Sequence, residues 1–139
     1  HLQKLQRVQN AAARVILGKP KQHRATALLR QLNWLPVPQR IDFNIACLVY
    51  KCLNGTAPSY LTCFIRPHSS TRALRSSQKF HLYQPCANLK SYGHRSFEFY
   101  GPMLWNTLPL HLRESAHKHS YEHFKSSLKN HLFTLAFNS

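Results

Sequence analysis

The sequence predicts a small, mainly α-helical domain. Apolar side chains recur at steps of three and four residues in several segments, which is the period of an amphipathic helix. Gly or Pro follows most of these segments, as expected where a helix ends. Of the 139 residues, 43 % are hydrophobic and 12 % are aromatic, which is enough for one hydrophobic core at this length. We therefore expect one domain, with room for a basic loop and one short β-hairpin.

The first predicted helix runs from Leu2 to Leu17. Gly18 closes it and Pro20 lies just beyond, the arrangement typical of a helix C-terminus. A short second helix is predicted over residues 25–32. The apolar stripe of the first helix consists of Leu2, Leu5, Val8, Ala12, Val15 and Ile16.

The third predicted helix begins at Pro38, since proline at the first helical position loses no hydrogen bond. It ends at Asn54-Gly55, and a further turn or two of helix is predicted over residues 58–65. The stripe of the third helix is the most regular of the chain and consists of Ile41, Ile45, Leu48, Val49 and Cys52.

The second half of the chain is less regular. Residues 66–79 are rich in Ser, Arg and Thr, which predicts a loop or arm. Residues 80–83 alternate enough for a short strand, which Phe97 and Phe99 could pair with. Around Trp105 we expect an irregular or short-helical stretch. Ser120 is the predicted cap of a last helix, whose face consists of Tyr121, Phe124, Leu128, Leu132 and Leu135.

These elements predict a single module in three parts: N-terminal helices (1–65), a basic arm (66–95), and a Trp/Pro region with the C-terminal helix (96–139). The chain begins at His1 and its one Met is Met103, so we expect a fragment of a longer chain or a processed product. No apolar run approaches the roughly 20 residues of a membrane helix. We expect the four Cys residues to be free thiols, and an intracellular location, nuclear or cytoplasmic.

Charge limits the possible functions most strongly. Nineteen Lys and Arg face four acidic residues, a formal net charge of +15, and such a surplus favours a polyanionic partner. The acids Asp42, Glu98, Glu114 and Glu122 are scattered singly. Two-metal phosphoryl transfer and paired-acid hydrolysis both need clustered carboxylates. We therefore predict a binding piece and not an autonomous enzyme.

Other catalytic patterns are equally weak. His119 and His123 have the i, i+4 spacing of zinc ligands on a helix, with His117 nearby. However, no Glu lies between them and no C-x₂-C pair lies close by. No Ser lies in a G-x-S-x-G elbow, and no two Gly residues form a phosphate-binding loop. We expect no metal, no cofactor and no small-molecule substrate.

The strongest functional signal is the basic arm. Its cations alternate with Ser and Thr, and both kinds of side chain contact phosphate oxygens. A second, weaker patch follows the first helix. We expect the neighbouring aromatics Phe80, Tyr83 and Tyr92 to lie in the core more readily than to stack on bases. The predicted nucleic-acid-binding residues are Arg66, Arg72, Arg75, Lys79, Lys90 and Arg95 in the arm, and Lys19, Lys21 and Arg24 in the second patch.

Several motifs share one resemblance. They are LQRVQNAAARVILG (5–18), LNWLPV (32–37) running into QRI (39–41), LNGTAPSYL (53–61), YGHRSF (92–97), PMLWNTLP (102–109), FKSSLK (124–129) and HLF (131–133). Together they resemble the C-terminal end of the reverse transcriptase polyprotein of non-LTR retrotransposons of the jockey, CR1 and L2 type. The resemblance covers nearly the whole chain in order. One departure is Gly101, where that family often has Ala.

The resemblance implies a region downstream of the polymerase palm that grips template RNA or target DNA. The paired-Asp catalytic motif of such polymerases is absent, since the one Asp is Asp42. We therefore expect a non-catalytic fragment that binds RNA or DNA without base specificity, and whose other partner is the upstream polymerase domain. Two alternatives remain open. The chain could be a protein-interaction module that docks on that domain, which predicts an exposed apolar patch, or a decayed element copy without activity.

Overall fold

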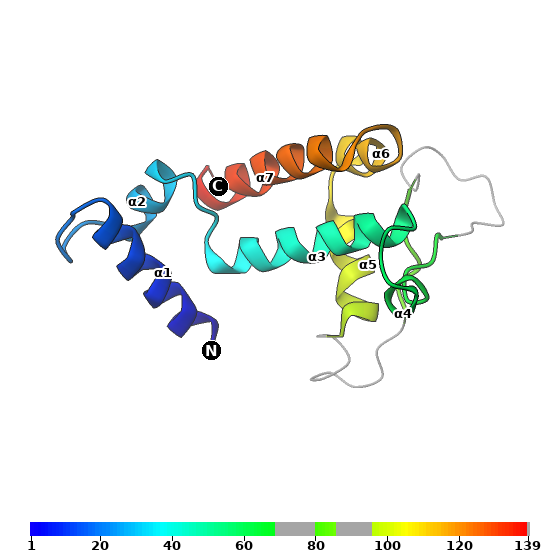
Figure 1. Cartoon of the computed structure of the whole chain (residues 1–139), viewed down its shortest axis with the longest axis horizontal. Coiled ribbons are helices and arrows are strands. Elements are labelled where there is room, and N and C mark those ends of the chain that lie inside the picture. Colours follow the sequence, from blue (N-terminus) through cyan, green and yellow to red (C-terminus); the bar gives the residue numbers. More distant parts are fainter. Residues whose placement is uncertain (69–79, 86–95, 139) are drawn as a thin grey trace. The chain divides into compact units, whose positions relative to one another are not determined.

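The computed structural model describes residues 1–68, 80–85 and 96–138. These residues are mainly helical, as the sequence predicts (Figure 1). The described chain contains seven helices: α1 (Leu2–Ile16), α2 (Ala25–Gln31), α3 (Val37–Leu53), α4 (Ser59–Thr62), α5 (Phe97–Thr107), α6 (Leu110–Lys118) and α7 (Tyr121–Phe137).

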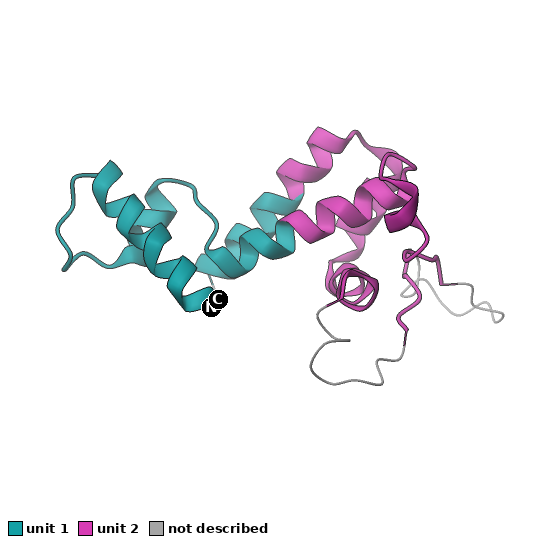
Figure 2. Ribbon diagram, turned by 60° about the horizontal axis from the view of Figure 1, so that its bottom comes forward, with its two compact units in different colours: residues 1–43, 128–139 teal, residues 44–127 magenta. Residues whose placement is uncertain are grey.

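The chain divides into two compact units (Figure 2). Unit 1 consists of residues 1–43 and 128–139, and unit 2 of residues 44–127. The division falls inside α3 and α7, so each of these helices contributes one part to each unit.

In unit 1, α1 packs on α2 through a small core. Ala13 is completely buried against Leu28 and Leu29. The small Ala side chain allows the two helices to approach closely. Partly buried side chains surround this core: Leu17, Leu32, Trp34 and Phe137.

The predicted stripe of α1 does not form this core. Ala13 is the one buried residue of the helix, whereas five residues of the stripe are exposed: Leu2, Leu5, Val8, Val15 and Ile16. The side of α1 that packs carries glutamines instead. Gln9 Nε2 donates to the carbonyl of Leu35 at 2.8 Å, and the amide of Val37 donates to Gln6 Oε1 at 2.8 Å. These bonds fix the segment between α2 and α3 against the polar side of α1.

Unit 2 is built around large aromatic side chains. Trp105 of α5 and Phe124 of α7 are completely buried, with ring centroids 5.8 Å apart. Tyr50 of α3 stacks on Phe124 at 4.7 Å, and its hydroxyl donates to the carbonyl of His119 at 3.0 Å. Nε1 of Trp105 donates to the carbonyl of Phe80 at 3.2 Å, which links α5 to residues 80–85.

Helix α5 approaches α3 closely at Gly101. A Cβ atom there would lie 3.2 Å from Cγ2 of Val49, tighter than most van der Waals contacts. Gly at this position therefore suits the close packing of the two helices. An Ala would require Val49 to move by a few tenths of an ångström.

The predicted β-hairpin is wrong in its pairing. Phe97 and Phe99 lie in α5, so they form no strand. Leu82 instead makes an isolated antiparallel bridge with Pro67. Two backbone hydrogen bonds hold the bridge. The amide of Tyr83 donates to the carbonyl of Arg66 at 2.8 Å, and the amide of His68 donates to the carbonyl of His81 at 3.0 Å.

Candidate nucleic-acid interface

The turn between α1 and α2 carries the second predicted basic patch. Gly18 adopts a positive φ of 59° and ends α1. The amide of Gly18 donates to the carbonyl of Val15 at 3.2 Å, and the amide of Lys19 donates to the carbonyl of Arg14 at 2.9 Å. This pair of hydrogen bonds is typical of a Schellman motif. This local geometry turns the chain so that Lys19, Lys21 and Arg24 are all exposed.

A pocket of about 560 Å³ lies in this turn. Arg14 spans the turn, since its Nη2 donates to the carbonyl of His23 at 3.4 Å. The pocket is lined by Ala11 and Val15 of α1 and by three cationic side chains, and no acidic side chain lines it. Its lining residues are Ala11, Arg14, Val15, Gly18, Lys19, Pro20 and Lys21.

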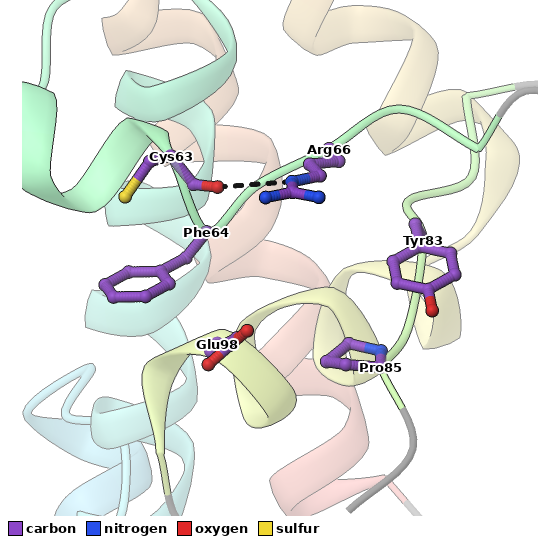
Figure 3. A pocket seen from close by; sticks show the side chains of 6 residues that line it. All are labelled: Cys63, Phe64, Arg66, Tyr83, Pro85 and Glu98. Atoms are coloured by element: carbon purple, nitrogen blue, oxygen red, sulfur yellow. Dashed lines mark hydrogen bonds between the residues drawn. The ribbon is translucent and has the colours of Figure 1, made fainter.

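Arg66 lies in unit 2, in a different setting. Its Nε donates to the carbonyl of Cys63 at 3.5 Å, and its side chain lines a pocket of about 170 Å³ with Phe64, Tyr83, Pro85 and Glu98 (Figure 3). Because Glu98 lines the same pocket, this site contains both charge signs. The Glu98 carboxylate would repel a phosphate, so this pocket suits an anion less well than the pocket of the α1–α2 turn does.

The other five predicted cations of the basic arm lie outside the described residues. They are Arg72, Arg75, Lys79, Lys90 and Arg95, and Tyr92 lies outside them as well. Of the two described aromatics that flank the arm, Phe80 stacks on His117 at 4.7 Å. Tyr83, which we expected in the core, is half exposed beside Arg66.

Two of the four acids form ion pairs away from the predicted cations. Glu114 pairs with Lys118, and Glu122 pairs with Lys125 at 3.3 Å. Each pair lies within one helix, so these carboxylates are bound by lysines of α6 and α7. The described cations of the predicted interface take part in neither pair.

His117, His119 and His123 lie at the end of α6 and the start of α7. The rings of His119 and His123 lie 4.5 Å apart, and the buried Ser115 hydroxyl lies 3.3 Å from His123 Nδ1, a contact that the sequence did not predict. In the described part of the chain, no three His, Cys, Asp or Glu side chains are grouped to hold a metal ion.

Three titratable groups in the packing of unit 2 have shifted pKa values. Burial raises the pKa of the Cys47 thiol, and a hydrogen bond from Tyr121 partly opposes this shift. Burial also raises the pKa of Tyr121 to about 12, and it lowers that of Arg113. A thiol with a raised pKa is a poor nucleophile. Cys47, Cys52 and Cys63 are free, as we expected, while Cys86 lies outside the described residues.

Within residues 1–68, 80–85 and 96–138, no helix is long and apolar enough to cross a bilayer. Comparisons of the chain with models of protein families, with curated proteins and with solved structures found no match.

Proposed function

We propose that this chain binds nucleic acid through the phosphate backbone, as a non-catalytic C-terminal part of a retrotransposon reverse transcriptase. The observation that supports this most directly is the α1–α2 turn. It exposes Lys19, Lys21 and Arg24 together, and no acid lines the adjoining pocket. The overall charge of +15 supplies the attraction at longer range.

Lysine ammonium groups act on phosphate as point charges and read no base. The proposed binding is therefore independent of sequence and applies to RNA and DNA alike. Arg66 offers a forked guanidinium beside the exposed ring of Tyr83, and such a pair suits a phosphate with a neighbouring base.

The test is the salt dependence of binding to an oligonucleotide. We expect log Kd to change linearly with log salt, with a slope of several units, because each phosphate contact releases about 0.7–0.9 counterion. The double variant Lys19→Gln/Lys21→Gln should reduce the slope by about 1.5.

A matched control removes the same charge elsewhere. Lys118→Gln/Lys125→Gln also lowers the net charge by two, but it replaces lysines already paired with Glu114 and Glu122. This variant should change the slope much less. Equal slopes for the two double variants, or a slope near zero for the wild-type chain, would contradict the proposal.

A second function, docking on a partner protein such as the upstream polymerase domain, is favoured by one observation. The apolar stripe of α1 is exposed, and exposed apolar patches of this kind commonly mark interaction surfaces. A decayed copy without activity would fail the binding tests for both functions.

A further inference from the structure

Helix α1 presents two sides of different character. One side packs on α2 and on the segment that leads into α3, through Ala13, Gln6 and Gln9. The other side carries apolar side chains that contact little else. Val15 is 81 % exposed and Val8 is 67 % exposed, while Ile16 and Leu5 are 58 % and 55 % exposed. Exposed apolar side chains that gather on one side of a helix commonly mark an interaction surface.

Three of these exposed residues, together with the partly buried Ala12, follow the spacing of a helix–helix seam. Leu5, Val8, Ala12 and Val15 are separated by three, four and three residues. This is the a/d pattern with which one helix packs along another. We refer to these four residues as the α1 seam. Leu2 and Ile16 lie beside it at the two ends of the helix.

Every charged residue of α1 beside the seam is a cation. Lys4 and Arg7 lie one residue before Leu5 and Val8 and are exposed. At the C-terminal end, Val15 lines the 560 Å³ pocket together with Arg14, Lys19 and Lys21, so the seam leads directly into that pocket. Residues 2–16 contain no acidic residue.

We propose that the α1 seam binds an acidic amphipathic helix of a partner protein. The apolar side chains of that helix would pack along Leu5, Val8, Ala12 and Val15. Its carboxylates would lie beside Lys4 and Arg7 and in the pocket with Lys19 and Lys21. This inference identifies the partner for the docking function proposed above, and it does not depend on nucleic-acid binding.

Charge argues against a second copy of this chain as the occupant. Two α1 helices placed face to face would bring Lys4, Arg7 and Arg14 of each copy together without one carboxylate from either helix, and like charges at these positions oppose pairing. A lipid surface is also less suitable. The seam is a narrow a/d stripe, and α1 contains no aromatic residue, whereas interfacial helices have broad apolar faces, commonly with Trp or Phe.

The experiment uses the whole chain and two synthetic three-heptad peptides. Both carry Ile and Leu at the a and d positions. One has Glu at the e and g positions and the other has Lys. We expect the chain to bind the Glu peptide at least tenfold more tightly than the Lys peptide, as measured by fluorescence anisotropy at moderate salt.

Variants then locate the site. Val8→Gln/Val15→Gln should weaken binding of the Glu peptide at least tenfold, and Lys4→Glu/Arg7→Glu should shift the preference toward the Lys peptide. Gln3→Ala, at an exposed position outside the seam, is the matched control and should change neither. Circular dichroism verifies that each variant keeps its helical content, which we expect because the replaced side chains are exposed.

Several outcomes would overturn the inference. These are equal binding of the two peptides, no binding of either, or no effect of the Val8/Val15 variant. Dimerisation of the free chain through Val8 and Val15 would show that a second copy is the occupant. Seam-dependent binding to anionic phosphatidylserine vesicles without binding of the Glu peptide would assign the surface to lipid. A Val8→Gln variant leaves every residue of the pocket with Lys19 and Lys21 in place. It should keep the wild-type salt slope for an oligonucleotide while it weakens binding of the Glu peptide, so failure here is distinct from failure of nucleic-acid binding.

Discussion

The side chain of Asn106 holds the segment that contains Leu82 against α5, and its removal has a calculable cost. The amide of Leu82 donates to Asn106 Oδ1 at 2.9 Å, and Asn106 Nδ2 donates to the carbonyl of Leu82 at 2.9 Å. Leu82 is 3 % exposed, so water cannot readily replace the lost partner. Asn106→Ala leaves one buried donor and one buried acceptor unpaired. Because Asn106 itself is partly exposed, we take the lower part of the usual penalty, roughly 1–2 kcal/mol for each group.

We therefore expect Asn106→Ala to lower the free energy of unfolding of unit 2 by about 2–4 kcal/mol. With a urea m-value of about 2 kcal/mol/M, the midpoint should fall by about 1–2 M. Hydrogen exchange gives a local measurement, since the exchange rate of the Leu82 amide should rise about 30- to 900-fold for that loss. The bridge to Pro67 holds Arg66 next to Tyr83, so the same variant should also loosen this part of the candidate interface.

Two further variants test the reasoning. Asn130→Ala, at an exposed position of α7, should change stability by less than about 0.5 kcal/mol. Asn106→Asp keeps the acceptor for the Leu82 amide but places a carboxylate against the Leu82 carbonyl, so it should recover stability when acid protonates the carboxylate. If Asn106→Ala cost no more than Asn130→Ala, the two hydrogen bonds would not hold this segment.

Two other predictions concern the end of α1 and alkaline pH. Gly18→Ala should lower stability by about 1 kcal/mol in thermal unfolding, because φ is +59°. The space around the Cα is open, so no clash adds to this cost. An unchanged melting temperature would show that this turn adopts another conformation. The raised pKa of Tyr121, about 12, means that the folded state prefers the neutral phenol. Its contribution to stability is complete below the ordinary value of 10 and is lost as pH rises toward 12. Ultraviolet titration of the phenolate in wild type and in Tyr121→Phe should reveal one late-titrating group that the variant lacks, and its absence from wild type would contradict the desolvation of this hydroxyl.

Helix positions were predictable where a local signal marks their ends. Gly18 ends the first helix as expected, Pro36 lies between α2 and α3, and α3 begins at Val37, one residue before the predicted Pro38. The stretch around Trp105 was harder. Pro102 lies inside α5, where proline removes an amide donor of the helix, so the local pattern did not distinguish helix from irregular structure. The burial of Trp105 stabilises this helix despite Pro102.

The candidate site was predictable in part. The cations of the α1–α2 turn were expected to be exposed because a charged segment after a helix end is normally solvated. The presence of Glu98 in the pocket of Arg66 was not predictable. These residues are 32 positions apart, and only the folding of unit 2 brings them to one pocket.

By itself, the sequence determined the helical class, the excess of positive charge and the lack of clustered carboxylates, because periodicity and composition are local properties. The tertiary structure decided which side of α1 is covered and which segment pairs with Leu82. An apolar stripe shows that a helix has two different faces, but the neighbours available in space decide which face packs. In α1, Ala13 fits closely against Leu28 and Leu29, and Gln6 and Gln9 satisfy the backbone of residues 35–37. The apolar stripe of α1, which has the pattern of a side that faces a core, therefore remains on the surface.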